Sequence, residues 1–265
     1  MRRCAARGGA AGGQLKPGGV RKIHMDIKDK VVVVTGASQG IGRAAAEYLG
    51  AHGAKVVLAA RSVGEIEALA KDLPDALAIA TDMRKPGDIL NLMDKTLAKY
   101  GRIDILINNA GQGMYGPVES IDIDKYKDIM ELNVFAVVRA MQAVIPVMRK
   151  QGGGMIVNVS SRVSKNYFPN LAAYASTKYA LNAISLTART ELEKDHIVVS
   201  VMHPKMTATN FGKNAVGTRP ASYANRPAST GGAPARPAGM EVDTAEAVAE
   251  KIAELIRTGE AEAEM

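Results

Sequence analysis

A tyrosine and a lysine four residues apart, Tyr174 and Lys178, are the pair in this sequence with the clearest chemical potential. On a helix they would lie on one face, one turn apart. A phenol has a pKa of about 10 and is a poor acid or base at neutral pH, but a neighbouring ammonium favours the phenolate and lowers that pKa. The spacing therefore predicts a tuned proton donor and acceptor, although a surface pair on an amphipathic helix has the same short pattern.

The elements that must position this pair are visible as short apolar runs that alternate with helical stretches. Because strands alternate with helices throughout, we predict an α/β, Rossmann-type doubly wound parallel sheet of six or seven strands in a single domain, residues 26–265. Ligands in such sheets bind beyond the carboxyl ends of the strands. The expected strands are 31–35, 55–60, 77–81, 103–107, 155–159 and 197–202, and the main helices are 43–52, 86–100, 123–151, 171–194 and 243–257.

A glycine-rich segment follows the first expected strand and leads directly into a helix. Strand, glycine turn and helix in that order are the context of a dinucleotide-binding loop. Gly36 would permit the tight turn, Gly40 the close approach of a phosphate, and Gly42 the close packing of helix on strand. Free N–H groups at the helix N-terminus would attract the pyrophosphate. We expect cofactor contacts from Gly36, Ser38, Gln39, Gly40, Ile41 and Gly42.

The end of the second expected strand bears on the choice of cofactor. An acid at this point holds the ribose 2′-hydroxyl of NAD, whereas an arginine accommodates the 2′-phosphate of NADP. This chain has Arg61 and Ser62 there, after two alanines. A planar guanidinium suits phosphate, so we predict NADP(H), with NAD(H) as the alternative. A solvated arginine at a strand end is the simpler structural explanation.

Further polar residues follow the third and fourth expected strands. Asp82 and Met83 are placed to contact the adenine, and Asn109-Ala110-Gly111 suits a close approach of the backbone to a ligand. Asn133 interrupts an apolar helical stretch. An asparagine within a helix is usually a small cost, and the functional alternative is that it binds a structural water.

Four motifs in this order resemble the short-chain dehydrogenase/reductase family over about residues 27–258. They are Thr35-Gly-Ala-Ser-Gln-Gly-Ile-Gly42, Asn108-Asn-Ala-Gly111, Ser161, and Tyr174-x-x-x-Lys178.

The resemblance implies a role for each catalytic candidate. Tyr174 would be the general acid and base, and Ser161 would hold the substrate carbonyl oxygen. Lys178 would lower the tyrosine pKa and bind the nicotinamide ribose, and Asn133 would anchor a water that links Lys178 to solvent. Ser161 is preferred over Ser160 because its interval to Tyr174 is the usual one in the family.

The segment after the sixth expected strand departs from the family pattern. The family usually has Pro-Gly followed by a threonine, whereas this chain has Pro204-Lys205 followed by Thr209. Pro204 and Thr209 would still meet the cofactor, but Lys205 puts the local backbone geometry in question. Little chain follows the last helix, so we expect the final strand to be short or missing.

Two stretches stand out by composition. Residues 1–24 carry six basic residues and no acid, which leaves 28 basic and 27 acidic residues for the rest of the chain. We interpret residues 1–25 as a disordered basic leader rather than a nucleic-acid-binding element.

Residues 214–240 are rich in Gly, Pro and Ala and match the position of the family's substrate lid. This segment is interpreted either as a mobile lid for an anionic substrate or as a loop kept soluble by its arginines.

The predicted function is an NADP(H)-dependent oxidoreductase that transfers hydride between the nicotinamide and a carbonyl or secondary alcohol substrate, such as a 3-oxoacyl compound or a general ketone. The alternative is a weakly active or inactive NADP-binding regulatory or scaffold protein. We expect a cytoplasmic homodimer or homotetramer that binds a small-molecule substrate, without a metal, a nucleic acid or a membrane as partner. The predicted substrate pocket consists of Gln112, Met114, Val163, Phe168 and Met206.

Overall fold

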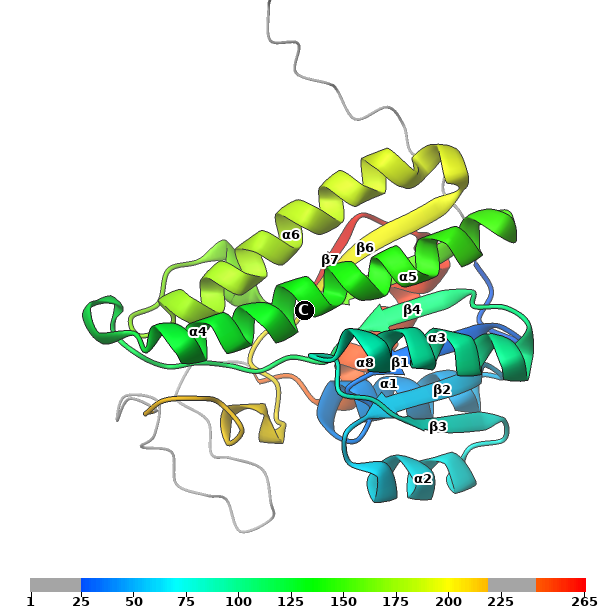
Figure 1. Ribbon diagram of the computed structural model, residues 1–265, viewed down its shortest axis with the longest axis horizontal. Helices are drawn as coiled ribbons and strands as arrows, with labels where there is room; N and C mark the ends of the chain where they lie inside the picture. The colour runs from blue at the N-terminus through cyan, green and yellow to red at the C-terminus, as the bar shows by residue number, and fades with distance from the viewer. Residues whose placement is uncertain (1–24, 219–241) are drawn as a thin grey trace, which may run out of the picture.

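The computed structural model describes residues 25–218 and 242–265. Its centre is a parallel sheet of seven strands in the order β3-β2-β1-β4-β5-β6-β7 (Figure 1). The order reverses beside β1, which creates the crevice in which doubly wound sheets bind their ligands. The strands are β1 Val31–Thr35, β2 Lys55–Ala60, β3 Ala76–Ala80, β4 Ile105–Asn108, β5 Gly154–Val159, β6 Ile197–His203 and β7 Glu262–Glu264.

Helices cover both faces of this sheet (Figure 1). Helices α1, α2 and α8 share one apolar cluster with the sheet, and α3, α5 and α6 share a second cluster on the opposite face. The two faces thereby form the three-layer arrangement of an α/β domain. The helices are α1 Gly40–Ala51, α2 Val63–Asp72, α3 Pro86–Tyr100, α4 Ile123–Met130, α5 Ala136–Lys150, α6 Ala172–Leu192 and α8 Ala245–Thr258.

The first strand shows why the central strands are continuously apolar. Val32 and Val34 belong to the cluster on one face, and Val31 and Val33 belong to the cluster on the other. Side chains alternate along a strand, so a strand covered on both faces needs apolar residues at every position. Because β1 is buried on both faces, its end and the glycine turn that follows it are held in place at the edge of the sheet.

The predicted fold class is confirmed, with seven strands. The final strand is short, as expected, and it pairs with β6 through Val201↔Glu262, Met202↔Ala263 and His203↔Glu264. The leader, residues 1–24, and residues 219–240 of the predicted lid lie outside the described residues. The assignment of these segments as leader and lid, like the single-domain boundary, stays a prediction.

The predicted helix 123–151 is one helical stretch with a wider turn inside it. Helix α4 passes into a five-residue π-helical turn, Glu131–Phe135, and then into α5. Such turns add a residue to the helix and often occur at functional sites. Among the described helices, this stretch alone is long and apolar enough to cross a membrane, and half of its most apolar window is buried within the protein. That burial is typical of a core helix.

Candidate active site

A cleft of about 1640 Å³ lies at the C-terminal ends of the parallel strands. It is lined by nearly all of the residues that the sequence predicts as cofactor, catalytic or substrate contacts. Gly42 and Asn133 are the two exceptions among them. The predicted residues that line the cleft are Gly36, Ser38, Gln39, Gly40, Ile41, Arg61, Ser62, Asp82, Met83, Asn109, Ala110, Gly111, Gln112, Met114, Ser161, Val163, Phe168, Tyr174, Lys178, Pro204, Met206 and Thr209.

The turn between β1 and α1 requires its glycines. Gly36 and Gly40 have φ angles of +68° and +57°, in the left-handed region that side chains disfavour. Gly42 has ordinary dihedrals, but a Cβ there would lie 2.4 Å from both the Asn109 Nδ2 and the Gly36 carbonyl oxygen. Gly42 therefore packs the start of α1 against the turn and the end of β4, and it does not face the cleft.

The ends of β1 and β4 are tied together by one threonine hydroxyl. The Thr35 Oγ1 accepts hydrogen bonds from the backbone N–H groups of Asn109, at 3.0 Å, and Ala110, at 3.1 Å. In return, the Asn109 amide donates to the carbonyl oxygens of Thr35 and Gly36. These bonds hold the two loops together across the floor of the cleft.

The N-terminus of α1 faces this floor without a local anion. Gln39 at its N-cap makes no side-chain capping bond, and the first turn contains no acidic residue. The first amides of a helix lack partners within the helix and, with the helix dipole, favour negative charge. This end of α1 is therefore chemically suited to a phosphate.

The end of β2 brings Arg61 and Ser62 to the rim of the cleft, where both are exposed. Beside them, at the end of β3, Met83 is only 6% exposed and belongs mainly to the core. The Asp82 carboxylate accepts a hydrogen bond from the Arg84 backbone N–H at 3.1 Å, which shapes this loop. The rim is thus basic at β2 and mixed at β3.

Helix α6 carries the tyrosine and the lysine on its buried face. Tyr174 is 8% exposed and Lys178 is 5% exposed. The Ser161 side chain lies close enough to the Tyr174 phenol to lower its pKa as a hydrogen-bonding partner. The Lys178 ammonium lies 5.9 Å from the centroid of the Tyr174 ring and donates to the Val159 carbonyl oxygen at 2.9 Å. The serine, the tyrosine and the lysine therefore converge beyond the end of β5.

Burial controls the protonation of this group. Burial raises the pKa of the Tyr174 phenol, and the hydrogen bond with Ser161 partly offsets that rise. Burial also lowers the pKa of Lys178 from 10.5 to about 8. The expectation that the tyrosine pKa is lowered is not met, because burial of the phenol dominates. At a distance of 5.9 Å, the ammonium does not outweigh the loss of water around the phenol.

Asn133 lies in the π-helical turn and is 1% exposed. Its Oδ1 accepts from the Gln112 backbone N–H at 2.9 Å, and its Nδ2 donates to the Gln112 carbonyl oxygen, also at 2.9 Å. The same amide donates to the Thr177 hydroxyl at 3.1 Å. The side chain thus clamps the loop after β4 to α6, and its predicted contact with a water stays a prediction.

The predicted pocket residue Gln112 is engaged by protein groups through its side chain. Its Oε1 accepts from Arg84 at 2.8 Å, and its Nε2 donates to the Asn214 carbonyl oxygen at 2.9 Å. Gln112 therefore bridges the loop after β3 and the described start of the predicted lid. Arg84 is a cleft residue that the sequence reasoning missed, because its contact with Gln112 joins two segments that are distant in the sequence.

The backbone at Lys205 does not need the glycine of the family pattern. Among the described residues other than glycine, positive φ angles occur at Asp29, Asn170 and His196, so Lys205 has a conformation that a side chain tolerates. Nearby, the Thr209 methyl carbon lies 3.1 Å from the position of a Cβ on Gly40. The segment after β6 therefore packs directly on the glycine turn.

The sequence also matches a known protein family. Residues 30–219 match the family of the short chain dehydrogenases. The chain belongs to the short-chain dehydrogenase/reductase family. Among curated relatives, it is 37% identical to an uncharacterized oxidoreductase of Staphylococcus saprophyticus over 190 residues, which cover 70% of this chain and 77% of the relative. It is 35% identical to dehydrogenase/reductase SDR family member 7B of Mus musculus, over 72% of this chain and 61% of that protein.

Solved structures of the family share this fold. An alcohol dehydrogenase from the archaeon Thermococcus sibiricus, complexed with 5-hydroxy-NADP, superposes with a TM-score of 0.76 at 26% identity, over 90% of this chain and 96% of the other. A 3-ketoacyl-(acyl-carrier-protein) reductase from Brucella melitensis, complexed with NADH, superposes with a TM-score of 0.77 at 27% identity, over 90% and 98%. These relatives bind a nicotinamide cofactor, with either NADP or NADH.

Two aromatic residues of this short-chain dehydrogenase were also missed from the sequence. The Phe211 ring lies 5.6 Å from the Tyr174 ring, tilted by 52°, and it contacts the space beside Gly113. Tyr115 lines the cleft and lies near enough to Tyr174 to raise the pKa of its phenol. Neither residue belongs to a motif, so folding alone places these rings beside Tyr174.

The described residues contain no cluster of three His, Cys, Asp or Glu side chains that could hold a metal ion. The polar groups that line the cleft include hydroxyls, amides, guanidinium groups, the buried Lys178 ammonium and the carboxylates of Glu47, Asp82 and Glu246.

Proposed function

We propose that this short-chain dehydrogenase is an NADP(H)-dependent oxidoreductase that acts on a carbonyl or secondary alcohol, with Tyr174 as general acid and base. The observation that carries the proposal is the convergence of Ser161, Tyr174 and the Lys178 ammonium at the end of a cleft that begins at Arg61. Arg61 and Ser161 follow strands three positions apart in the sheet, which is roughly 14 Å at about 4.8 Å per strand.

The residues present fit a dinucleotide. The glycine turn, which lines the cleft, and the uncapped end of α1 would receive the pyrophosphate. Arg61 and Ser62 would hold the adenosine 2′-phosphate. Further contacts would come from Ser38, Gln39, Ile41, Asp82, Met83, Asn109, Ala110, Gly111, Pro204 and Thr209, with Tyr174 and Lys178 at the nicotinamide ribose. When bound, the nicotinamide supplies or accepts the hydride.

The protein's own groups manage the proton and the substrate oxygen. In the reducing direction, Tyr174 donates its proton to the carbonyl oxygen while Ser161 donates a hydrogen bond to the same oxygen. Both bonds strengthen as charge develops on that oxygen, so they favour the transition state over the ground state. With a pKa of about 8, Lys178 is about nine-tenths protonated at pH 7 and stabilises the phenolate that remains.

Substrate recognition is assigned to the apolar side of the cleft. Met114, Val163, Phe168 and Met206 line it together with Phe211. This lining favours an apolar ketone, and the similarity to a 3-ketoacyl reductase makes 3-oxoacyl compounds suitable members of the first substrate panel.

Tyr174→Phe tests the catalytic proposal. The variant keeps the ring, its packing against Phe211 and the cofactor cleft, but it lacks the proton. We expect NADPH binding to survive and turnover to fall by about 10³-fold or more, as for loss of a general acid together with its hydrogen bond. Tyr126→Phe, which removes another phenol from the same domain, is the matched control. Equal turnover in wild type and Tyr174→Phe would refute the assignment.

The buried phenol also supports a second function. Burial raises the pKa of Tyr174, which opposes base catalysis and is compatible with a weakly active NADP-binding regulatory or scaffold protein. This alternative predicts NADPH binding with no turnover across a broad carbonyl panel. Detectable reduction of any ketone that depends on Tyr174 would exclude it.

Arg61→Asp tests cofactor choice. A carboxylate would repel the 2′-phosphate and accept a hydrogen bond from a 2′-hydroxyl, so the preference should shift from NADPH toward NADH by about 100-fold or more. Lys71→Asp makes the same charge change on exposed α2, away from the cleft lining, and serves as the control. The measurement is kcat/KM with each cofactor. An unchanged ratio in Arg61→Asp would contradict NADP selection by this residue.

We also propose that the enzyme is a cytoplasmic homodimer or homotetramer that forms through its long helices. Exposed apolar side chains on the α4–α5 stretch, including Ile123 at 58% and Phe135 at 48%, support this contact. Light scattering on the purified protein would give the oligomeric state, and a monomeric mass at micromolar concentration would contradict the proposal.

A further inference from the structure

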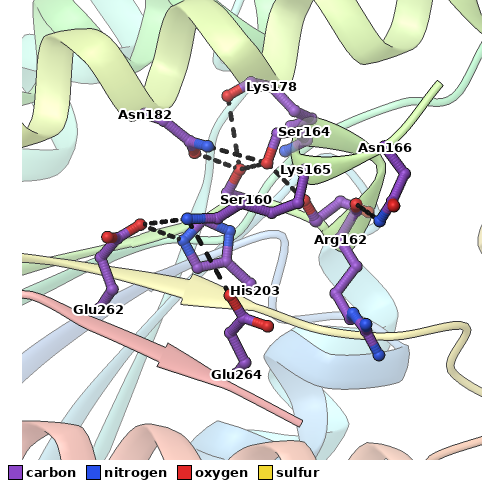
Figure 2. Close-up of polar contacts among 11 residues, drawn as sticks. Ser160, Arg162, Ser164, Lys165, Asn166, Lys178, Asn182, His203, Glu262 and Glu264 are labelled. Atoms are coloured by element: carbon purple, nitrogen blue, oxygen red, sulfur yellow. Dashed lines mark hydrogen bonds and ion pairs between the residues drawn. The ribbon is translucent and has the colours of Figure 1, made fainter.

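A polar network joins the residues around Ser161 to helix α6, and Figure 2 shows Ser160, Ser164 and Asn182 pointing toward one another within it. Ser161 begins a short 3₁₀ turn, Arg162–Lys165, and its side chain accepts from the Val163 backbone N–H at 3.3 Å. We call residues 161–165 the Ser161 turn. One side of the turn lines the cleft. The position of the Ser161 hydroxyl therefore depends on the contacts that the turn makes on its buried side.

A chain of three hydrogen bonds runs from Ser160 through Asn182 of helix α6 to Ser164 and back to the start of the turn. The Ser160 hydroxyl donates to the Asn182 Oδ1 at 2.6 Å, and the Asn182 Nδ2 donates to the Ser164 Oγ at 2.8 Å. The Ser164 hydroxyl then donates to the carbonyl oxygen of Ser161 at 2.6 Å. Ser160 is 4% exposed and Ser164 is 2% exposed, so water does not compete for these bonds.

We propose that Asn182 is a positioning residue that sets the place of the Ser161 hydroxyl through Ser164. The inference rests on the proposed function, because Ser161 is there assigned to the substrate oxygen. Asn182 lies four residues beyond Lys178 on the same helix, hence on the same face. One rigid element therefore carries Tyr174 and Lys178 and also fixes Ser161.

The chain of bonds requires an amide at position 182. Ser164 uses its only proton on the Ser161 carbonyl, so its oxygen must accept from a donor. Ser160 donates its proton to residue 182, which must therefore accept as well. An amide offers both functions, whereas a carboxylate offers acceptors alone. With aspartate at this position, the Ser164 proton would turn toward the carboxylate and release the Ser161 carbonyl.

A second contact holds the far end of the turn and is much weaker. Lys165 pairs with Glu262 of β7 at 2.9 Å, and Glu262 also contacts the buried His203 ring at 2.8 Å (Figure 2). The side chains of Lys165 and Glu262 are 37% and 35% exposed. Partly exposed pairs are screened by solvent and add little rigidity. The buried chain through Asn182 therefore dominates the position of the turn.

The test uses Asn182→Asp and, as a second variant, Ser164→Ala. Asn91→Asp is the matched control, since it makes the same chemical change at an exposed residue of α3 that lies outside the cleft lining. We expect kcat to fall about tenfold in both test variants, the value for one lost hydrogen bond, with the KM for NADPH unchanged. The control should match the wild type.

A double-mutant cycle separates positioning from general damage to the fold. In a Ser161→Ala background, which has no hydroxyl to position, Asn182→Asp and Ser164→Ala should cause no further loss of kcat. The same tenfold loss in both backgrounds would overturn the proposal. So would wild-type kcat in Asn182→Asp and Ser164→Ala.

Hydrogen exchange supplies a readout that does not need turnover. The backbone N–H groups of Val163 and Ser164 bond to Ser161, so their exchange should accelerate in Asn182→Asp but not in Asn91→Asp. Unchanged exchange in Asn182→Asp would overturn the proposal. If exchange accelerates as expected while the wild type reduces no carbonyl, the positioning holds and the proposed function fails.

Discussion

Burial of the Lys178 ammonium makes the free energy of unfolding depend on pH. The side chain is 5% exposed, and burial alone lowers its pKa from 10.5 to about 8. We expect Lys178→Met to lose turnover and also to change the slope of stability against pH. Methionine fills a similar volume with an apolar chain that carries no proton, so the comparison isolates the titration of this one amine.

The sign follows from the order of the two pKa values. Between about 8 and 10.5, the unfolded chain binds a proton at Lys178 that the folded chain does not, so stability rises with pH across this window. The gain from this group between pH 7 and pH 10 is about 2.5 kcal/mol, at 1.36 kcal/mol per pH unit. Below pH 8 both states are protonated, and folding carries the full cost of burying the charge.

The absolute stability of the variant is less informative than the slope. At pH 7 it avoids burying a charge, but it leaves the Val159 carbonyl oxygen without its donor at 2.9 Å, which costs about 1–3 kcal/mol. These terms have opposite signs and similar size. The pH dependence contains only the first of them.

The assay is urea unfolding at pH values from 7 to 10. The series stops at pH 10 because Tyr174 has the opposite effect on stability above that pH. Its pKa is raised in the folded protein, so the unfolded chain loses the phenol proton first and stability falls as pH rises. The difference in stability between wild type and Lys178→Met should change by about 2.5 kcal/mol over the range. Lys127→Met, at an exposed lysine of α4, is the control. Parallel curves for wild type and Lys178→Met would refute the inference that the ammonium is buried at a cost.

Two further predictions concern residues that folding brings together. Gly42→Ala should destabilise the protein by about 2 kcal/mol or more, because its Cβ would overlap the Asn109 amide and the Gly36 carbonyl. The melting temperature should fall by about 4 °C or more. Gly87→Ala, where the added Cβ meets open space, should leave it unchanged or higher, and equal shifts in both variants would contradict the packing argument. Phe211→Ala should lower kcat/KM for bulky apolar ketones about tenfold, because the ring walls the space beside Tyr174. Phe135→Ala, outside the cleft lining, is its control in the same substrate panel, and an equal loss there would contradict a specific role.

The sequence alone predicted the local features that depend on neighbouring residues. The apolar run of β1 and the glycine turn after it follow from the burial and backbone conformation of contiguous residues. Tyr174 and Lys178 could be paired because four residues on a helix define one face. The same reasoning predicted the parallel sheet, since alternating strands and helices leave few topologies. Expected element ends differed by a few residues from those observed, because helices fray and tertiary contacts set their limits.

Contacts between distant segments were decided by the tertiary structure. No local pattern indicated that Asn133 clamps Gln112, that Phe211 faces Tyr174, or that Ser164 holds the Ser161 carbonyl. The pKa expectation for Tyr174 was wrong for the same reason, since burial raises the pKa of this phenol. Sequence spacing placed an ammonium nearby, but only the packed structure shows how completely the phenol is removed from water. Spacing along a chain determines which side chains share a face, whereas solvent exclusion depends on the whole fold.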